Sequence, residues 1–236
     1  MIAPLALPGT LPGFSNPVDD SQAVFRAVLT AFSRPGLPVS LTLPPFPVPS
    51  GELSPGMLAL ALALCDQDTP IWLDTAANTP EVRHHLRFHC AAPFAAELTQ
   101  GSFAFIARPE AMPRLQAFNP GRADYPDRSA TLVINADLSS PQACAMELTG
   151  PGVKGNDREA WQSFRISGLP PWFWEGWEAN RAAYPLGLDV IFVDKGTESA
   201  DRPAIRLLGL PRTARVRLAP HEQTDYLPPK EHRTCM

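Results

Sequence analysis

Apolar residues at helical spacing are clearest in the first third of the chain. Residues 1–18 are rich in Pro and Gly and predict an extended arm, after which a helix begins that Asp19 or Asp20 could cap. Two further helices are predicted from cap-and-proline starts at Ser54-Pro55 and Thr79-Pro80. The run of Ala and Leu over 58–64 has no polar face, which predicts that the second helix is buried. On the first helix, the apolar face consists of Val24, Phe25, Val28, Leu29 and Phe32.

Strands are predicted where short apolar or β-branched runs stand between turn-forming residues. Residues 204–210 and 213–218 predict a hairpin at the edge of a sheet, and residues 171–184 predict a helix rich in aromatic residues. Strands mixed with helices indicate the α/β class, with a mixed sheet covered by helices. The remaining predicted strands cover 38–43, 71–73, 103–107, 131–135, 145–149 and 188–193.

The chain shows no repeat and no linker, so residues 19–218 are predicted to form a single α/β domain. Residues 219–236 have no apolar period and predict a flexible tail. The longest apolar run, from Met57 to Cys65, is too short to span a bilayer, and no charged residue precedes Asp19 to mark a signal peptide. The four cysteines are scattered and form no Cys-x-x-Cys pair, so we expect a reduced, cytoplasmic protein.

Composition narrows the classes of function. With 44% apolar and 19% charged residues, the chain is globular rather than disordered. The net charge of −4 does not favour a nucleic-acid binder, which usually carries a basic face.

A glycine-rich segment after the strand at 145–149 matches the pattern G-x-G-x-x-G. In dinucleotide-binding folds these glycines let the backbone approach a pyrophosphate at a helix start. Here no apolar helix follows and no N-terminal βαβ unit precedes, so a glycine-rich turn is the favoured interpretation. The alternative is a loop that holds an anion through Gly150, Gly152, Lys154, Gly155 and Arg212.

Three histidines and a cysteine cluster in the third helix: His84, His85, His89 and Cys90. His85 and His89 are four residues apart, so they share a helix face and could hold one metal ion. A zinc site needs at least a third ligand, and no other His or Cys lies near this cluster in the sequence. A polar helix face is favoured, and no metal site is predicted.

The sequence also lacks clear signals for a Schiff-base lysine and for a nucleophilic serine. A Schiff-base enzyme needs a buried lysine, and Lys154, which alone could reach a cofactor, is in a polar loop. No Gly-x-Ser-x-Gly elbow is present. The residues themselves therefore predict no catalytic residue and no cofactor.

The aromatic helix at 171–184 raises the question of a binding surface. Its side chains Phe173, Trp174, Trp177 and Tyr184 fall within an arc of about 100°, which predicts one buried stripe. Trp172 falls outside this arc. It either packs locally after Pro170-Pro171 or serves as an exposed anchor for another subunit.

Six segments, in order, resemble the PhnH family, phosphonate-metabolism proteins that are subunits of the carbon–phosphorus lyase core complex. They cover nearly the whole chain apart from the first dozen residues and the tail. In this sequence they read NPVDDSQAVFRAVLTAFSRPG within 14–36, LCDQDTPIWL at 64–73, LRFHCAAP at 86–93, LTGPG at 148–152, YPLGLDVIFVD at 184–194 and LPRTARV at 210–216.

The resemblance implies the fold of pyridoxal-phosphate-dependent transferases without the cofactor site. It implies a homodimer that joins PhnG, PhnI and PhnJ in the core complex. With PhnI, PhnG and PhnL, the family supports synthesis of α-D-ribose 1-methylphosphonate 5-triphosphate from ATP and methylphosphonate. Nucleosidase-type chemistry is assigned to PhnI and C–P cleavage to PhnJ, so this subunit is expected to be non-catalytic.

Two other functions stay open. One is an independent small-molecule transferase that keeps a cofactor, through Lys154 or through the face shared by His85 and His89. The other is a regulatory module that binds an anion or nucleotide through the loop at 150–155 and Arg212.

Overall fold

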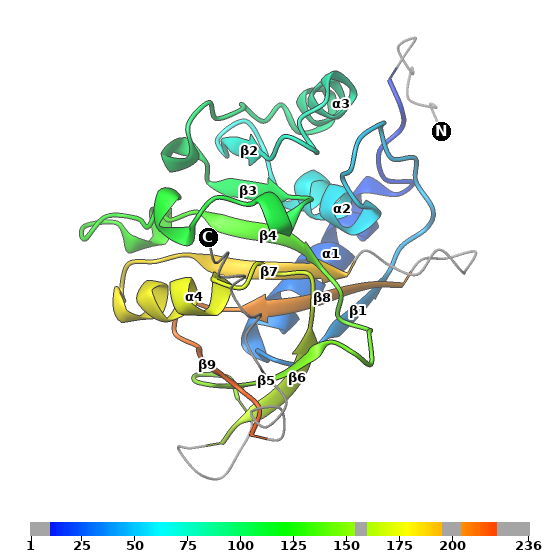
Figure 1. The fold of residues 1–236 in the computed structure, drawn as a ribbon. Coiled ribbons are helices and arrows are strands. Elements are labelled where there is room, and N and C mark those ends of the chain that lie inside the picture. The colour runs from blue at the N-terminus through cyan, green and yellow to red at the C-terminus, as the bar shows by residue number, and fades with distance from the viewer. Residues whose placement is uncertain (1–9, 154–159, 195–203, 221–236) are drawn as a thin grey trace, which may run out of the picture.

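The structure is a computed structural model that describes residues 10–153, 160–194 and 204–220. Its centre is a mixed sheet of six strands. The four strands β2, β3, β4 and β7 pair in parallel, and β8 is antiparallel to both of its neighbours, β7 and the edge strand β1 (Figure 1). In spatial order the strands are β1 (Val39–Thr42), β8 (Ala204–Leu210), β7 (Asp189–Asp194), β4 (Thr131–Ala136), β3 (Phe103–Ile106) and β2 (Ile71–Leu73).

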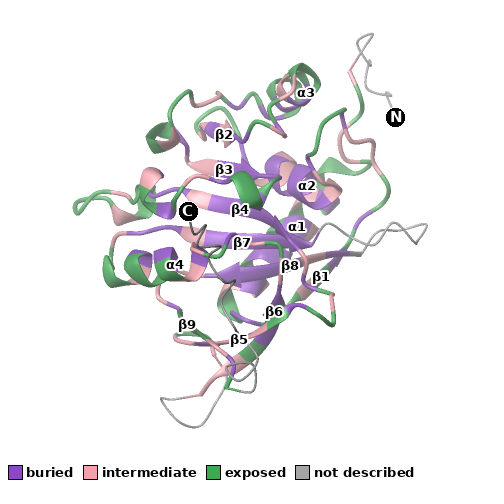
Figure 2. Cartoon of the chain, in the orientation of Figure 1, coloured by how far each residue is buried: buried purple, intermediate pink, exposed green. Residues whose placement is uncertain are grey.

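Three helices pack on one face of this sheet: α1 (Pro17–Ser33), α2 (Pro55–Leu64) and α3 (Pro80–Cys90). Successive residues of a strand point to opposite faces, and β4 shows the consequence. Val133 packs with the helices, whereas Leu132 and Ile134 pack in the core on the other face. Because both faces are covered, the parallel strands are almost continuously buried (Figure 2).

The opposite face is covered by α4 (Phe173–Ala182) and a second sheet. This small sheet is antiparallel, in the order β6 (Gln162–Ile166), β5 (Cys144–Thr149), β9 (Arg215–Leu218). In the described part of the chain, four short 3₁₀ helices lie in the connections before and after β3: η1 (Leu98–Gln100), η2 (Pro109–Ala111), η3 (Leu115–Ala117) and η4 (Pro126–Arg128).

The α/β class, with a mixed sheet covered by helices, is confirmed, but the predicted edge hairpin is wrong. Strand β8 lies inside the large sheet, between β1 and β7, while β9 pairs with β5 in the small sheet. The chain changes sheets at the turn 211–214 between them. Adjacency in the sequence suggested that the two segments pair. However, β8 places Ile205 and Leu207 in the core on one face and Leu208 and Leu210 in the core on the other, and a strand buried on both faces gains more from two neighbours than from an edge position.

The first helix departs from its predicted cap and face. Asn16 is its N-cap, and the Asn16 side chain accepts a hydrogen bond from the Asp19 backbone N–H. Val24 and Val28 are buried as expected, but Phe25 and Leu29 are about half exposed, at 50% and 53%. The buried face also includes Ala27 and Ala31, whose small side chains let α1 lie close to the sheet. Asp20, in the first turn, is buried as well.

The predicted aromatic stripe holds only in part. Phe173 and Trp177 are buried and Trp174 is partly buried, but Tyr184 is 63% exposed. Helix α4 ends at Ala182, so Tyr184 no longer follows the helical period that placed it in the stripe.

The second and third helices match their predictions. Ser54 and Thr79 cap α2 and α3, each accepting a hydrogen bond from a backbone N–H three residues on. Among the described residues, no helix is both long and apolar enough to cross a bilayer. Lys154 and Gly155, and the predicted tail from residue 221 on, lie outside the described residues.

Candidate functional site

Polar side chains gather at the carboxyl ends of the parallel strands, the edge where open α/β sheets usually bind ligands. Asp74 directly follows β2, Arg108 follows β3, and Asn135 lies near the end of β4. Asp74 and Asn135 are 7% and 3% exposed. Buried polar groups at this depth need hydrogen-bond partners, so their partners decide whether they are available for chemistry.

Each of these buried groups is bonded to the protein itself. Asp74 accepts hydrogen bonds from the backbone N–H groups of Ala77 (2.9 Å) and Arg108 (2.8 Å). Asn135 accepts one from the Ser54 hydroxyl at 2.9 Å and donates one to the carbonyl of Ala107 at 3.3 Å. These bonds fasten the loops at the strand ends to one another.

The loop 49–54, which precedes α2 in the chain, is hydrogen-bonded both to this edge and to the start of α3. Glu52 pairs with Arg108 through two hydrogen bonds, one of them 2.6 Å between Arg108 Nε and a carboxylate oxygen. The Ser50 carbonyl accepts a hydrogen bond from the Thr79 hydroxyl at 2.7 Å, which ties the loop to the start of α3. The polar edge and the first turn of α3 therefore belong to one continuous region of the surface.

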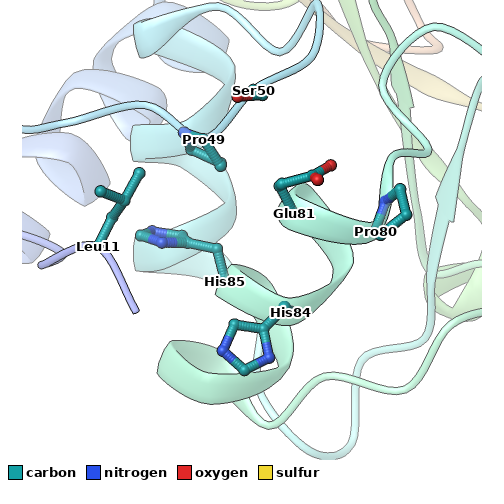
Figure 3. Close-up of a pocket in the computed structure, with 7 residues that line it drawn as sticks. All are labelled: Leu11, Pro49, Ser50, Pro80, Glu81, His84 and His85. Atoms are coloured by element: carbon teal, nitrogen blue, oxygen red, sulfur yellow. The ribbon is translucent and has the colours of Figure 1, made fainter. Parts of the chain in front are cut away.

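A pocket of about 310 Å³ opens in this region, between α3, the loop and the N-terminal segment (Figure 3). One of its walls is the first two turns of α3, and the His85 ring points from there toward Leu11 and Pro49. The lining residues are Leu11, Pro49, Ser50, Pro80, Glu81, His84 and His85.

His85 is the unusual group of this pocket. Its side chain is 2% exposed, and neither ring nitrogen has a hydrogen-bond partner among the described residues. Burial lowers the His85 pKa from 6.5 to about 4, with smaller contributions from His89 and His84. The ring is therefore neutral at physiological pH and holds one unused donor and one unused acceptor.

The other two histidines of α3 hold the N-terminal segment in place. His89 Nε2 lies 2.9 Å from the Leu11 carbonyl oxygen, and His84 Nε2 lies 3.2 Å from the Thr10 hydroxyl. Gly13 lies so close to His89 that an added Cβ would be 3.1 Å from Nδ1. Leu11 is thereby positioned beside the His85 ring.

The histidine cluster does not form a metal centre. Within the described ranges, no group of three or more His, Cys, Asp or Glu residues is placed to hold an ion. The Glu81 carboxylate points away from the rings of His84 and His85 in Figure 3. Cys90 is buried and donates to the Ala61 carbonyl at 3.6 Å, and burial raises its pKa to about 11, so the thiol stays protonated.

Two residues of the predicted anion loop have packing roles. Gly152 has φ +88°, and a Cβ there would lie 2.6 Å from the Ser33 carbonyl oxygen at the end of α1. Only glycine permits this approach, and the carbonyl end of a helix does not attract an anion. Gly150, with φ +147°, lies against the backbone of Thr213 and Ala214.

Arg212, the cation of that predicted loop, is bonded to other parts of the protein. Its guanidinium contacts the Asp189 carboxylate at 2.5 Å and the Ser129 hydroxyl at 2.5 Å. It also donates to the carbonyls of Pro126 at 2.9 Å and Pro185 at 3.3 Å. The anion loop remains a prediction, because Lys154 and Gly155 lie outside the described residues.

Trp172 precedes α4 and is half-buried. Its ring packs against the core on the α4 face, and the Arg114 guanidinium lies 4.5 Å from the ring centroid. The position is compatible with either of the two roles predicted for Trp172.

A family model described as "Bacterial phosphonate metabolism protein (PhnH)" matches residues 12–217 of this chain. The chain belongs to the PhnH family. The match runs from residue 12 to the third residue of β9, and it contains the carboxyl edge, Arg212 and every residue that lines the α3 pocket except Leu11.

Two curated relatives agree with this assignment. The chain is 35% identical over 205 residues to a Rhizobium meliloti protein named "Alpha-D-ribose 1-methylphosphonate 5-triphosphate synthase subunit PhnH", covering 86% of this chain and 93% of that protein. It is 30% identical over 197 residues to the Stutzerimonas stutzeri protein named "Putative C-P lyase subunit protein HtxG", covering 84% and 86%.

Sequence reasoning missed the polar edge of this PhnH-family chain. Asp74 gave a usable signal, because it directly follows a predicted strand. Glu52, Arg108 and Asn135 gave none, since their contacts join segments more than 25 residues apart. The histidines were singled out, but only the structure showed that they face the N-terminal segment.

Proposed function

We propose that this chain is a non-catalytic structural subunit of the carbon–phosphorus lyase core complex. In that role it supports synthesis of α-D-ribose 1-methylphosphonate 5-triphosphate from ATP and methylphosphonate. The observation that carries the proposal is the similarity to the Rhizobium meliloti synthase subunit, which extends over 86% of this chain and 93% of the relative.

The polar edge supports a structural role. Asp74 and Asn135 lie where an α/β enzyme would place catalytic groups, but their hydrogen bonds go to neighbouring loops. The buried thiols of Cys65 and Cys90 have raised pKa values because burial disfavours the thiolate, so neither is an activated nucleophile.

The partners we propose are a second copy of this chain and the subunits PhnG, PhnI and PhnJ, with PhnL joining for the synthase reaction, in the cytoplasm. Co-expression of the tagged chain with these subunits from one phosphonate operon tests this. We expect PhnG, PhnI and PhnJ to co-purify in fixed ratio, and light scattering of the chain alone to give the mass of two 25.7 kDa chains. Recovery of the chain without the other subunits would contradict the proposed function.

We also propose that the fold is that of the pyridoxal-phosphate-dependent transferases, with no cofactor bound. A Schiff-base lysine needs a buried site and a phosphate cradle beside it. The purified chain incubated with pyridoxal phosphate is expected to show no aldimine absorption, and Lys154→Ala to leave the activity of the complex nearly intact. A yellow protein that bleaches on this substitution would overturn the proposal.

The outer face of α1 supports an assembly role. Val18, Phe25 and Leu29 are 64%, 50% and 53% exposed, and their spacing of seven and four residues places them on one stripe. Exposed apolar side chains gathered in a row are typical of protein contact surfaces. We propose that this stripe, called the α1 stripe below, contacts another chain of the complex.

A further inference from the structure

A second pocket, about 320 Å³ in volume, lies between the N-terminal segment and the helices α1, α2 and α3, and we call it the arm pocket. Phe14, Leu62 and Phe88 supply apolar walls, and none of the described lining residues is Asp, Glu, Lys or Arg. Phe88 is 46% exposed and Leu11 is 39% exposed, so the pocket leaves large apolar side chains in contact with water. Such a surface gains free energy when another apolar group covers it.

The polar groups of the arm pocket are engaged inside the protein. The Thr10 hydroxyl lies 3.2 Å from His84 Nε2, and His89 Nε2 lies 2.9 Å from the Leu11 carbonyl oxygen. Among the described lining residues, Ser21 is the one other hydroxyl. Pockets for small molecules combine apolar walls with a few free polar groups that orient the ligand. The arm pocket therefore fits apolar side chains better than it fits a polar small molecule.

The chain itself supplies apolar side chains next to this pocket. Residues 1–9, which lie outside the described residues, read MIAPLALPG and contain no charged side chain. The first described residues, 10–14, line the pocket, so the preceding residues join the chain at its wall. An extended chain covers at most about 3.3–3.6 Å per residue, which places Leu5 within about 18 Å of Thr10. The segment is therefore close enough to reach the pocket.

The residues immediately before the pocket favour a reversal of the chain toward it. Pro at the second position and Gly at the third are typical of a type II β-turn, and Leu7-Pro8-Gly9-Thr10 has this pattern. Such a turn brings residues 5–7 back alongside residues 10–12. Alternate side chains of an extended segment point to the same side, so Leu5 and Leu7 would face one surface together.

We propose that residues 5–7 of this chain dock in its own arm pocket, with the Leu5 and Leu7 side chains against the Phe88 ring. Burial of these three side chains removes apolar area from water. Pro4 and Pro8 restrict the undocked segment, which lowers the conformational entropy lost on docking. The contact needs no other subunit, so it is independent of the subunit role proposed above.

Alkylation of a thiol placed in the pocket tests this in the full-length chain. Ser21→Cys puts the thiol in the lining, and Gln22→Cys, at the exposed neighbour on α1 that does not line the pocket, is the matched control. Mass spectrometry of peptides after iodoacetamide treatment separates the new thiol from the native cysteines. We expect Leu5→Ser combined with Leu7→Ser to speed labelling of the Ser21→Cys chain by about fivefold or more, and to leave the Gln22→Cys chain unchanged.

Three outcomes of the labelling would overturn the proposal. One is an equal rate in the Ser21→Cys chain with and without the two leucines. Another is protection restored to the leucine variant by co-expression with an excess of wild-type chain, which would mean that the segment comes from a second copy. The third is protection that arises only in the complex with PhnG, PhnI and PhnJ. Co-purification of the leucine variant with those subunits reports on the subunit role separately.

A second measurement identifies the contact itself. In a chain with labelled leucine methyl groups, the signals of Leu5 and Leu7 are assigned by their loss in the two single Ser variants. These signals should show nuclear Overhauser effects to the Phe88 ring, which disappear in Phe88→Ser. Tyr125→Ser, at an aromatic ring that is 49% exposed and does not line the pocket, should keep them. Absence of any such effect between either leucine and Phe88 in the wild type would overturn the proposal.

Discussion

At the scale of single residues, His85 occupies a core position of α3 that a leucine or phenylalanine would usually fill. It follows the apolar period of the helix, with Val82, Leu86 and Cys90 buried on the same face. Burying an imidazole without hydrogen bonds destabilises the folded state. This position therefore lowers the stability of the folded chain.

The lowered pKa of His85 makes stability depend on pH. Above pH 6.5 the ring is neutral in the folded and in the unfolded chain. Between pH 6.5 and about pH 4 the unfolded chain binds a proton at this ring, whereas the folded chain does not. Stability is therefore full above pH 6.5 and falls as the pH drops toward 4. The shift from 6.5 to about 4 corresponds to about 3 kcal/mol.

We predict that His85→Phe removes most of this dependence. Free energies of unfolding measured in urea at pH 7.5 and pH 4.5 should differ by about 2–3 kcal/mol less in the variant than in the wild type. His84→Gln, at an exposed neighbour, should keep most of the wild-type difference. If wild type and His85→Phe lose equal stability between the two pH values, the His85 pKa is not lowered by burial.

At the scale of elements, Trp177 ties α4 to the turn between the two sheets. Trp177 is 1% exposed, and its ring N–H donates to the Ala214 carbonyl at 2.9 Å, in the turn between β8 and β9. It therefore ties the helix to the point where the chain passes from the large sheet to the small one. Trp172, at the start of the same helix, is only half-buried.

We predict different effects for the two tryptophans. Trp177→Ala should destabilise the chain by about 3–5 kcal/mol, because it leaves a large cavity and an unpaired carbonyl. If Trp172 is an anchor, Trp172→Ala should cost little stability and weaken assembly by at least about 2 kcal/mol. Thermal melting and co-purification measured for both variants separate these roles. Equal destabilisation by both would mean that Trp172 belongs to the core.

Arg212 joins three segments that are far apart in the sequence: the start of β7 at Asp189, η4 with Ser129, and the turn after β8. A planar guanidinium can bond to several acceptors at once, which an ammonium cannot. The Arg212 and Asp189 side chains are 14% and 25% exposed, so solvent screens their ion pair little.

Arg212→Lys is therefore predicted to destabilise the chain by roughly 2–3 kcal/mol, although it conserves the charge. Arg181→Lys, at the exposed pair with Glu178 on α4, is the comparison and should cost under about 1 kcal/mol. Chemical denaturation of both variants measures the difference. A cost for Arg212→Lys no larger than that for Arg181→Lys would show that the bidentate geometry is unimportant.

At the scale of the whole molecule, the α1 stripe is an exposed apolar surface whose residues repeat at helical spacing. Its side chains point away from the sheet, while Val24 and Val28 on the other face of the helix fill the core. A helix that is apolar on both faces is unusual in a monomer, because one face remains in water.

We predict that Phe25→Ser weakens assembly without unfolding the chain. Light scattering should show a loss of dimer, or co-purification a loss of one partner subunit, with a melting temperature close to that of the wild type. Arg26→Gln, also exposed on α1, changes no apolar area and should have neither effect. Unchanged assembly in Phe25→Ser would remove the α1 stripe as a contact surface.

The sequence by itself determined the elements whose signals are local. Ser54-Pro55 and Thr79-Pro80 start helices because a side-chain cap and a fixed φ act within one turn. The runs at β4 and β7 formed buried strands because continuous apolar residues suit a sheet covered on both faces. The ordered motifs likewise identified the PhnH family, which the match over residues 12–217 confirmed.

Tertiary structure alone decided how these elements combine. It placed β8 and β9 in different sheets, since pairing depends on neighbours that the chain reaches only over long distances. In the folded chain Phe25 is exposed, and the Arg212 guanidinium is bonded to Asp189. The N-terminal segment lies against α3, where His89 contacts the Leu11 carbonyl. It also left His85 buried without a partner, because hydrogen bonds to a side chain depend on which segments fold over it, and its spacing in the helix gives no sign of them.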